Sequence, residues 1–221
     1  MRKYDLYIFD FDYTLGDTTK AIAESINYGL VSLNHEPQPL EKIIPTIGIT
    51  LHDAYFILTG VSPTPNEEKN ADKFFGFFME KADTCMTESA ELYEYTVPLL
   101  KKIKASGAKT AIVTTKAKYR IEEILERFGI SFLIDVIVGS DIVTNPKPHP
   151  ESVFAALSET GFSAENTVYI GDSVVDARAA AAGQVDFIGV LTGTTNRDIL
   201  EKENNINIFN DLGELYNEYL A

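Results

Sequence analysis

Residues 6–14 read Leu-Tyr-Ile-Phe-Asp-Phe-Asp-Tyr-Thr. The first four form a continuous apolar run, which is typical of a strand that is buried on both faces of a parallel sheet. Two carboxylates, Asp10 and Asp12, follow this run directly. Open α/β sheets bind their ligands just beyond the carboxyl ends of the strands. A buried strand that ends in paired acids therefore predicts such a sheet, with a functional site at this edge.

The segment from residue 92 onward repeats the same pattern. Short apolar runs rich in β-branched residues predict further strands at 111–113, 136–138, 168–170 and 187–190. Amphipathic helical patterns separate these runs, and they end near glycines at positions 107, 129, 161 and 183. Strands that alternate with helices in this order predict an α/β fold with a doubly wound parallel sheet.

Residues 16–86 have a different pattern. Apolar side chains recur there at helical spacing, in stripes that begin at Ile22, Leu51 and Ala71, and prolines mark the loops between them. We therefore predict a small all-helical domain at 16–86, inserted after the first strand, and an α/β core formed by residues 1–15 and 87–221. The insert is expected to have a core of its own, built from Phe74, Phe75, Phe77 and Phe78; the alternative is that these side chains line the cleft between the insert and the α/β core.

The other predicted strands also lead into polar residues. Because parallel strands end at the same edge of a sheet, these residues are expected to meet Asp10 and Asp12 there. They are Thr114-Thr115-Lys116 after the strand at 111–113, Lys147 after 136–138, and Asp172 and Asp176 after 168–170.

These groups suit the transfer of a phosphoryl group. Asp10 and Asp172 offer oxygen ligands, and a site made only of oxygens favours Mg²⁺ over zinc. One carboxylate of the Asp10 and Asp12 pair can attack phosphorus, while the other protonates the leaving oxygen and later activates water. The hydroxyl of Thr114 and the ammonium of Lys147 would bind the phosphoryl oxygens.

The chain resembles the haloacid dehalogenase (HAD) superfamily, in the branch of small phosphatases related to phosphoglycolate phosphatase and β-phosphoglucomutase. The resemblance covers nearly the whole chain. It implies a Rossmann-like core, with the insert at 16–86 as a helical cap that closes over the site. The matching segments are Asp10-Phe11-Asp12-Tyr13-Thr14-Leu15, Ile112-Val113-Thr114-Thr115-Lys116, Lys147-Pro148-His149-Pro150 and Gly171-Asp172-Ser173-x-x-Asp176.

The resemblance also implies a role for each motif residue. It makes Asp10 the nucleophile and Asp12 the general acid and base. It implies Mg²⁺ as cofactor, held by Asp10, the backbone carbonyl of Asp12, and Asp172, with Asp176 in a supporting position. The implied substrate-binding residues are Thr114, Thr115 and Lys147.

Some positions leave alternatives open or depart from the family. Lys116 competes with Lys147 for the phosphate-binding role. Lys147 is favoured because it fits the Lys-Pro-x-Pro motif, and Lys116 is expected to begin a solvated helix. Asp176 either supports the metal site or caps the helix that follows Asp172. Tyr13 stands where the family usually has glycine, and its side chain is expected to narrow the entrance or to contact the substrate. Glu94-Tyr95 replaces the usual Pro-Gly, which leaves the point where the cap returns to the core open.

Composition limits the class of partner. The 221 residues include 19 Lys and Arg against 33 Asp and Glu, a formal net charge of −14. An acidic surface repels phosphate backbones and anionic lipid, so we expect no nucleic-acid or membrane partner. Cys85 is the only cysteine, and the N-terminal apolar run is too short for a signal peptide. We therefore expect a cytoplasmic enzyme, monomeric or homodimeric, that acts on a small phosphorylated metabolite.

Two other activities use similar groups. A sugar-phosphate mutase keeps both aspartates but returns the phosphoryl group to its substrate instead of to water. A phospho-receiver also combines carboxylates, a hydroxyl and a lysine around Mg²⁺, but it needs neither the second acid nor an inserted domain of this size. A dehalogenase is disfavoured, because a leaving halide needs no proton from an acid such as Asp12. The sequence therefore favours a phosphatase over these alternatives.

Overall fold

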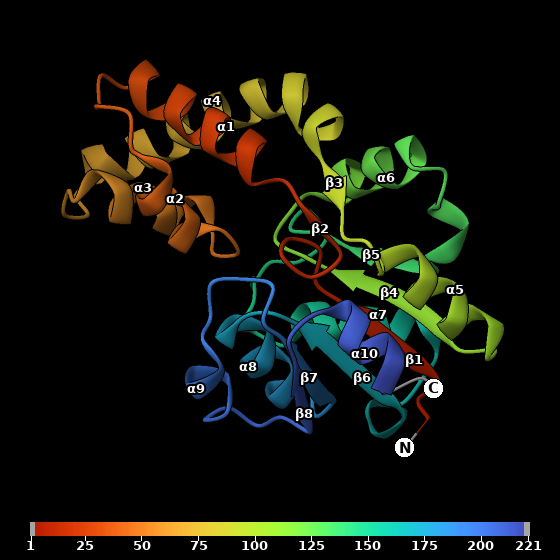
Figure 1. The fold of residues 1–221 in the computed structure, drawn as a ribbon. Helices are drawn as coiled ribbons and strands as arrows, with labels where there is room; N and C mark the ends of the chain where they lie inside the picture. The colour runs from red at the N-terminus through yellow and green to blue at the C-terminus, as the bar shows by residue number, and fades with distance from the viewer. Residues whose placement is uncertain (1–2, 219–221) are drawn as a thin grey trace. The chain divides into compact units, whose positions relative to one another are not determined.

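The fold is taken from a computed structural model, which describes residues 3–218 (Figure 1). Contacts divide the chain into two compact units. One contains the residues up to Asp17 and from Glu91 onward, and the other is Thr18–Ala90. The insert expected at 16–86 lies within four residues of the second unit at either end (16 against 18, and 86 against 90).

The first unit is built on a parallel six-stranded sheet. Its strand order is β5-β4-β1-β6-β7-β8, so β1 lies in the middle and the chain winds outward in both directions, as predicted. Phe9, the last residue of β1, is paired with Ile112 of β4 and Ile170 of β6, so these three strands end at the same level. The strands are β1 Leu6–Phe9, β4 Lys109–Val113, β5 Val136–Val138, β6 Thr167–Gly171, β7 Asp186–Val190 and β8 Asn207–Phe209.

Alternate side chains of β1 enter different apolar layers. Leu6 and Ile8 belong to a buried cluster with side chains of α7 and α8, while Tyr7 and Phe9 lie together with side chains of α5 and α10. Burial on both faces explains why the strands are continuous apolar runs. The helices of this unit are α5 Thr96–Ala105, α6 Lys118–Arg127, α7 Glu151–Thr160, α8 Val174–Ala182, α9 Arg197–Leu200 and α10 Leu212–Glu218, with 3₁₀ turns η2 Ser131–Leu133 and η3 Ala164–Asn166.

Two short strands were not predicted within the unit that carries the sheet. β2 (Gly16–Asp17) pairs antiparallel with β3 (Glu91–Leu92), at the two points where the chain leaves and re-enters this unit. Strands of two residues are too short for an alternating pattern to be recognised. The prediction that no strand lies within 16–86 is therefore wrong for β2. The same lack of pattern explains why β8, α9 and α10 were not predicted.

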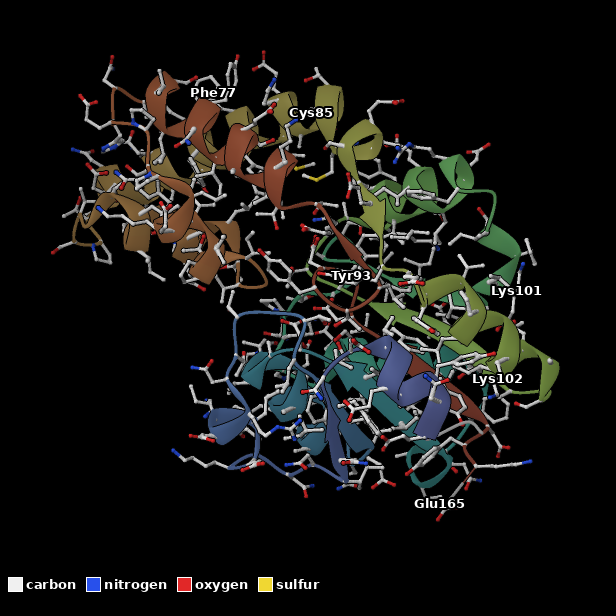
Figure 2. All side chains as sticks on the ribbon, viewed as in Figure 1. Phe77, Cys85, Tyr93, Lys101, Lys102 and Glu165 are labelled. Carbon is white, nitrogen blue, oxygen red and sulfur yellow. The ribbon has the colours of Figure 1, made fainter. Side chains whose placement is uncertain are left out.

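The second unit is all-helical. Its helices are α1 Thr19–Ser32, α2 Leu40–Ile43, α3 Leu51–Thr59 and α4 Pro65–Ser89, with a 3₁₀ turn η1 Ile44–Thr46. Phe74 and Phe78 of α4 are buried in its core, as expected. Phe75 is 52% exposed and Phe77 is half-buried (Figure 2), so placing all four phenylalanines in the core was wrong. Successive residues of a helix point about 100° apart, which prevents neighbours from sharing one buried face.

Across residues 3–218, no helix combines the length and the apolar character that a membrane span requires.

The contact between α1 and α4 gives a stability prediction. A Cβ added at Gly29 of α1 would lie 2.7 Å from Cδ2 of the buried Phe74 ring. Gly29→Ala should lower the free energy of unfolding by about 1–3 kcal/mol through overpacking. The control is Gly76→Ala on α4, where a Cβ meets no atom within 4 Å. It should raise stability by roughly 0.5–1 kcal/mol, because alanine is the better helix former. Urea unfolding of both variants tests this, and equal shifts would contradict the packing argument.

Candidate active site

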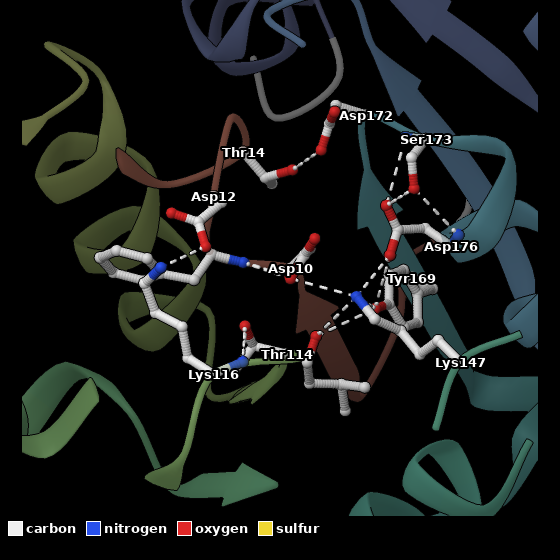
Figure 3. A network of polar contacts seen from close by, with 12 residues as sticks. Asp10, Asp12, Thr14, Thr114, Lys116, Lys147, Tyr169, Asp172, Ser173 and Asp176 are labelled. Atoms are coloured by element: carbon white, nitrogen blue, oxygen red, sulfur yellow. Dashed lines mark hydrogen bonds and ion pairs between the residues drawn. The ribbon is translucent and has the colours of Figure 1, made fainter. Parts of the chain in front are cut away.

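Three carboxylates meet at the carboxyl end of the sheet (Figure 3). Asp10 follows β1, Asp172 follows the neighbouring strand β6, and Asp176 lies in the first turn of α8. One oxygen of each lies within 4.8 Å of the others, and none of the three residues is more than 5% exposed. The parallel pairing of β1 with β6 brings Asp10 and Asp172 together, although 162 residues separate them (172 − 10).

Lys147 is the buried cation of this cluster. It precedes α7, and its Nζ lies 2.7 Å from Oδ1 of Asp176 and 3.1 Å from Oδ1 of Asp10. Nζ also lies 3.2 Å from the hydroxyl oxygen of Tyr169. The side chain of Lys147 is only 3% exposed. The lysine expected to bind phosphate thus lies beside the expected nucleophile.

The cluster carries an excess of negative charge. Burial raises the pKa of Asp10 to about 7, Lys147 opposes this shift, and Asp176 adds to it. Burial also raises the pKa of Asp172 well above its usual value, and the charges of Asp176 and Asp10 raise it further. The pKa of Lys147 is raised well above normal, since its carboxylate partners outweigh the lowering effect of burial. Three acids against one lysine leave room for a cation of charge two, and an all-oxygen donor set fits a hard divalent ion.

Asp12 lies beside this cluster with a cation of its own. Its Oδ2 is 2.6 Å from Nζ of Lys116, and the two side chains are 8% and 9% exposed. The expectation that Lys116 begins a solvated helix is wrong, because α6 begins two residues later and the lysine side chain turns to Asp12. The ion pair joins residues that are 104 positions apart, so no local pattern could have indicated it.

The predicted threonines lie after β4. Thr114 is 5% exposed, and its Oγ1 accepts a hydrogen bond of 3.2 Å from the backbone N–H of Lys116. Thr115 is half-buried next to it. This leaves the hydroxyl proton of Thr114 available to an incoming oxygen, which fits the expected phosphate-binding position.

Two residues without a predicted role hold Asp172. The hydroxyl of Thr14 donates to Oδ1 of Asp172 over 3.2 Å. Gly193 lies on the other side, where an added Cβ would be 1.8 Å from Oδ2 of Asp172. Only a glycine permits this approach of backbone to carboxylate. Thr14 could have been selected as part of the first motif, whereas Gly193 lies in a loop with no motif.

Asp176 caps the helix that follows Asp172, which is one of the two roles that the sequence left open, and it also lies in the carboxylate cluster. Its Oδ2 accepts a hydrogen bond of 3.2 Å from the backbone N–H of Ser173, and Oγ of Ser173 accepts one of 3.2 Å from the backbone N–H of Asp176, so the two residues form a capping box at the start of α8. Its Oδ1 binds Lys147. The helix cap therefore holds the carboxylate in place for the lysine.

Tyr169 is a buried polar residue of the cluster that sequence reasoning missed. Its side chain is fully buried in β6, its hydroxyl lies 3.1 Å from both Oδ1 of Asp176 and the carbonyl oxygen of Val113, and it accepts from Lys147. The only signal was one phenol within an apolar strand, which is equally consistent with core packing.

Tyr13 follows Asp12 and precedes Thr14 in the first motif. Its backbone is in the left-handed region, with a φ of 59°. Its N–H donates to the carbonyl of Gly16 over 2.8 Å, and its carbonyl accepts from the hydroxyl of Thr192. This conformation costs an L-residue roughly 1–2 kcal/mol relative to the right-handed form. The turn explains why a glycine would suit this position.

Comparison with known proteins identifies the family. The model of the haloacid dehalogenase-like hydrolases matches residues 7–190, which include every motif residue described above. The chain belongs to this family. It is a hydrolase of the HAD type, and the fold agrees. A solved haloacid dehalogenase-like hydrolase from Bacteroides fragilis is 33% identical, with a TM-score of 0.91 over 96% of this chain and 100% of that one.

Curated relatives of this HAD-type hydrolase have phosphatase names. A phosphoglycolate phosphatase from Colwellia psychrerythraea is 28% identical over 196 residues, which cover 87% of each chain. A pyrophosphatase, PpaX, from Bacillus velezensis is 31% identical over 183 residues, which cover 83% of this chain and 81% of the relative.

The left-handed backbone of Tyr13 gives a second stability prediction. Tyr13→Gly removes the backbone strain together with the side chain, whereas Tyr13→Ala removes the side chain alone. The glycine variant should therefore be more stable than the alanine variant by about 1 kcal/mol. Urea midpoints measured side by side test this. A higher midpoint for the alanine variant would contradict the strain at this position.

Proposed function

We propose that this protein is an Mg²⁺-dependent phosphatase that hydrolyses a small phosphate monoester through an aspartyl-phosphate on Asp10. The observation that carries the proposal is the buried Asp10 carboxylate. It belongs to the cluster of three carboxylates and lies 3.1 Å from Nζ of Lys147, with a second acid two residues further along the chain. Family membership and the phosphatase names of the relatives support the same chemistry.

The carboxylate cluster is the proposed cation site. Asp10 and Asp172 would hold Mg²⁺ through their side chains, Asp12 through its backbone carbonyl, and Asp176 would support them. Three buried acids beside a single lysine fit a divalent ion, and burial raises the pKa of two of them, Asp10 and Asp172. When bound, Mg²⁺ supplies positive charge that offsets the charge of the phosphoryl oxygens and keeps the carboxylates ionised.

Asp10 is held in one orientation for attack. The backbone N–H of Phe11 donates to its Oδ1 over 2.7 Å, and Lys147 lies 3.1 Å from the same oxygen. Oδ2 is then the oxygen that attacks phosphorus. A new bond forms between Oδ2 and phosphorus, and the bond from phosphorus to the leaving oxygen breaks. Lys147 and Thr114 stabilise the charge of the transferred group.

Asp12 handles the protons. In the first half-reaction it gives its proton to the leaving oxygen. In the second it takes a proton from the water that attacks the phosphoryl group on Asp10, which releases inorganic phosphate and restores both acids. Nζ of Lys116 lies 2.6 Å from Oδ2 of Asp12, and this contact orients the side chain of Asp12.

The substrate class follows from the family. One relative is named for phosphoglycolate and another for pyrophosphate, and both compounds are small phosphorylated molecules. We propose a small phosphorylated metabolite as substrate, with the helical unit Thr18–Ala90 as the cap that selects it by closing. A cytoplasmic location and a monomeric or homodimeric state stay predictions.

A phosphate-release assay over a panel of phosphate esters, with Mg²⁺ and again with EDTA, tests the proposal. Release should depend on Mg²⁺, and Asp10→Asn should lower it at least about a thousandfold with folding retained. Asn is nearly isosteric with Asp, and circular dichroism checks the fold. If the Asp10→Asn variant released phosphate with Mg²⁺, this would contradict the assignment of Asp10 as the nucleophile. Isomerisation of a sugar 1-phosphate without phosphate release would favour a sugar-phosphate mutase. A stable phosphoprotein without turnover would favour a phospho-receiver.

The role of Asp12 predicts a specific defect. Asp12→Asn cannot donate or accept the proton, but an activated leaving group such as 4-nitrophenolate needs no protonation. With 4-nitrophenyl phosphate this variant should release about one equivalent of nitrophenolate per site in a burst, followed by slow turnover. With an alkyl phosphate it should show neither phase. Stopped-flow absorbance measures the burst. Slow steady release without a burst would contradict the two-step role of Asp12.

A further inference from the structure

The phenol of Tyr169 contacts the lysine proposed to bind phosphate, but it takes no part in the proposed phosphoryl or proton transfer. Tyr169 lies in β6, and its side chain is fully buried (Figure 3). Its hydroxyl oxygen lies 3.2 Å from Nζ of Lys147, and 3.1 Å from both the carbonyl oxygen of Val113 and Oδ1 of Asp176. These residues all belong to the unit that carries the sheet. The hydroxyl therefore links the lysine to two further oxygens.

The number of protons fixes the direction of these hydrogen bonds. An ammonium group only donates, so the Tyr169 oxygen accepts from Lys147. The phenol has a single proton of its own, and the Val113 and Asp176 oxygens lie at the same distance of 3.1 Å. The hydroxyl can thus donate to either oxygen while it still accepts from the lysine.

Lys147 has more acceptors than protons. Among residues 3–218, its Nζ lies within 3.4 Å of four oxygens. They are Oδ1 of Asp176 at 2.7 Å, Oδ1 of Asp10 at 3.1 Å, the Tyr169 hydroxyl at 3.2 Å and the Val113 carbonyl at 3.4 Å. An ammonium group has three protons. A phosphoryl oxygen would be a fifth acceptor, so Lys147 has to release part of these contacts when it binds one.

The Val113 carbonyl is the acceptor that Lys147 can release most easily. It is the most distant of the four oxygens, and it carries no net charge. Loss of a donor from a buried carbonyl is unfavourable. The Tyr169 hydroxyl lies 3.1 Å from this carbonyl and can supply the donor. The charged contacts of Lys147 with Asp10 and Asp176 are then kept.

We propose that Tyr169 is a positioning residue for Lys147. Its hydroxyl holds Nζ of Lys147 beside Asp10, and it takes over the Val113 carbonyl when the lysine turns to the transferred phosphoryl group. This inference rests on the proposed phosphatase function, and it adds a residue that acts through the lysine without contact to the substrate.

Loss of this hydroxyl should affect the transition state more than substrate binding. Without it, Lys147 keeps its charge and still attracts a phosphate dianion. Its Nζ loses an acceptor that fixes its direction, and a charged group stabilises a transition state fully only when it is held in place beforehand. We therefore expect kcat to fall while KM stays nearly the same.

The variant Tyr169→Phe tests this role with 4-nitrophenyl phosphate and Mg²⁺. It removes the hydroxyl and keeps the ring, which belongs to the apolar cluster on one face of the sheet. We expect kcat to fall about tenfold, the usual effect of one hydrogen bond to a charged group, and KM to stay within about twofold. Orthovanadate, which mimics five-coordinate phosphorus, should inhibit about tenfold more weakly. The inhibition constant of inorganic phosphate should stay within about twofold.

Tyr4→Phe is a matched control. The buried hydroxyl of Tyr4 donates to Oδ2 of Asp186 over 2.6 Å, so this variant also removes a hydrogen bond between a phenol and a carboxylate. Asp186 begins β7 and pairs with Val168 near the start of β6, whereas Asp172 follows the end of β6. Tyr4→Phe should therefore lower the urea midpoint but leave kcat, KM and both inhibition constants unchanged.

A magnesium titration separates an effect on the lysine from an effect on the carboxylates. If Tyr169 acts through Lys147, the Mg²⁺ concentration for half-maximal activity should agree within about twofold between wild type and Tyr169→Phe. A tenfold increase would show that the hydroxyl acts through Asp176 and the proposed cation site, and it would overturn the inference.

The remaining outcomes also decide the question. An unchanged kcat, or a loss that appears in KM instead, would overturn the role of Tyr169. If circular dichroism shows that Tyr169→Phe does not fold, the hydroxyl has a structural role and the inference is overturned as well. If wild type hydrolyses no phosphate ester, 4-nitrophenyl phosphate included, the proposed function itself fails. If wild type hydrolyses 4-nitrophenyl phosphate but the selective loss of kcat is absent, only the role of Tyr169 fails.

Discussion

Mutual repulsion of buried carboxylates is the constraint on which the site depends. Asp10, Asp172 and Asp176 bring their oxygens within 4.8 Å of one another, with Lys147 as the cation beside them. Like charges in a buried setting are unfavourable unless cations and hydrogen-bond donors compensate them. The surrounding donors are the Ser173 backbone N–H in the capping box, the hydroxyl of Thr14 and the phenol of Tyr169, which donates to Oδ1 of Asp176.

The sheet makes this arrangement possible. β1 lies between β4 and β6 in parallel register, so the residues that follow all three strands emerge at one level. Apolar layers on both faces fix the strands. The acids thus lie at the ends of strands that backbone pairing and core packing hold in place. Such a scaffold can carry an electrostatically unfavourable cluster.

The two lysines illustrate the limits of motif reasoning. Lys147 was expected at the site because it stands in the Lys-Pro-x-Pro motif, and its side chain is buried against Asp10 and Asp176. Lys116 was expected in solvent, yet it binds Asp12, a residue 104 positions away. Tyr169 and Gly193 were missed for the same reason. Their neighbours come from distant parts of the chain, and the surrounding sequence carries no pattern that identifies them.

The sequence by itself determined the order of the main strands and helices, the helical character of the insert, and the acids that follow β1 and β6. These features depend on local periodicity and on motifs with fixed spacing. Only the tertiary structure decided which cation faces which carboxylate, which phenylalanines are buried, and that β2 pairs with β3. Such contacts depend on distances between residues far apart in sequence, and those distances are set only when the sheet assembles and the helices pack.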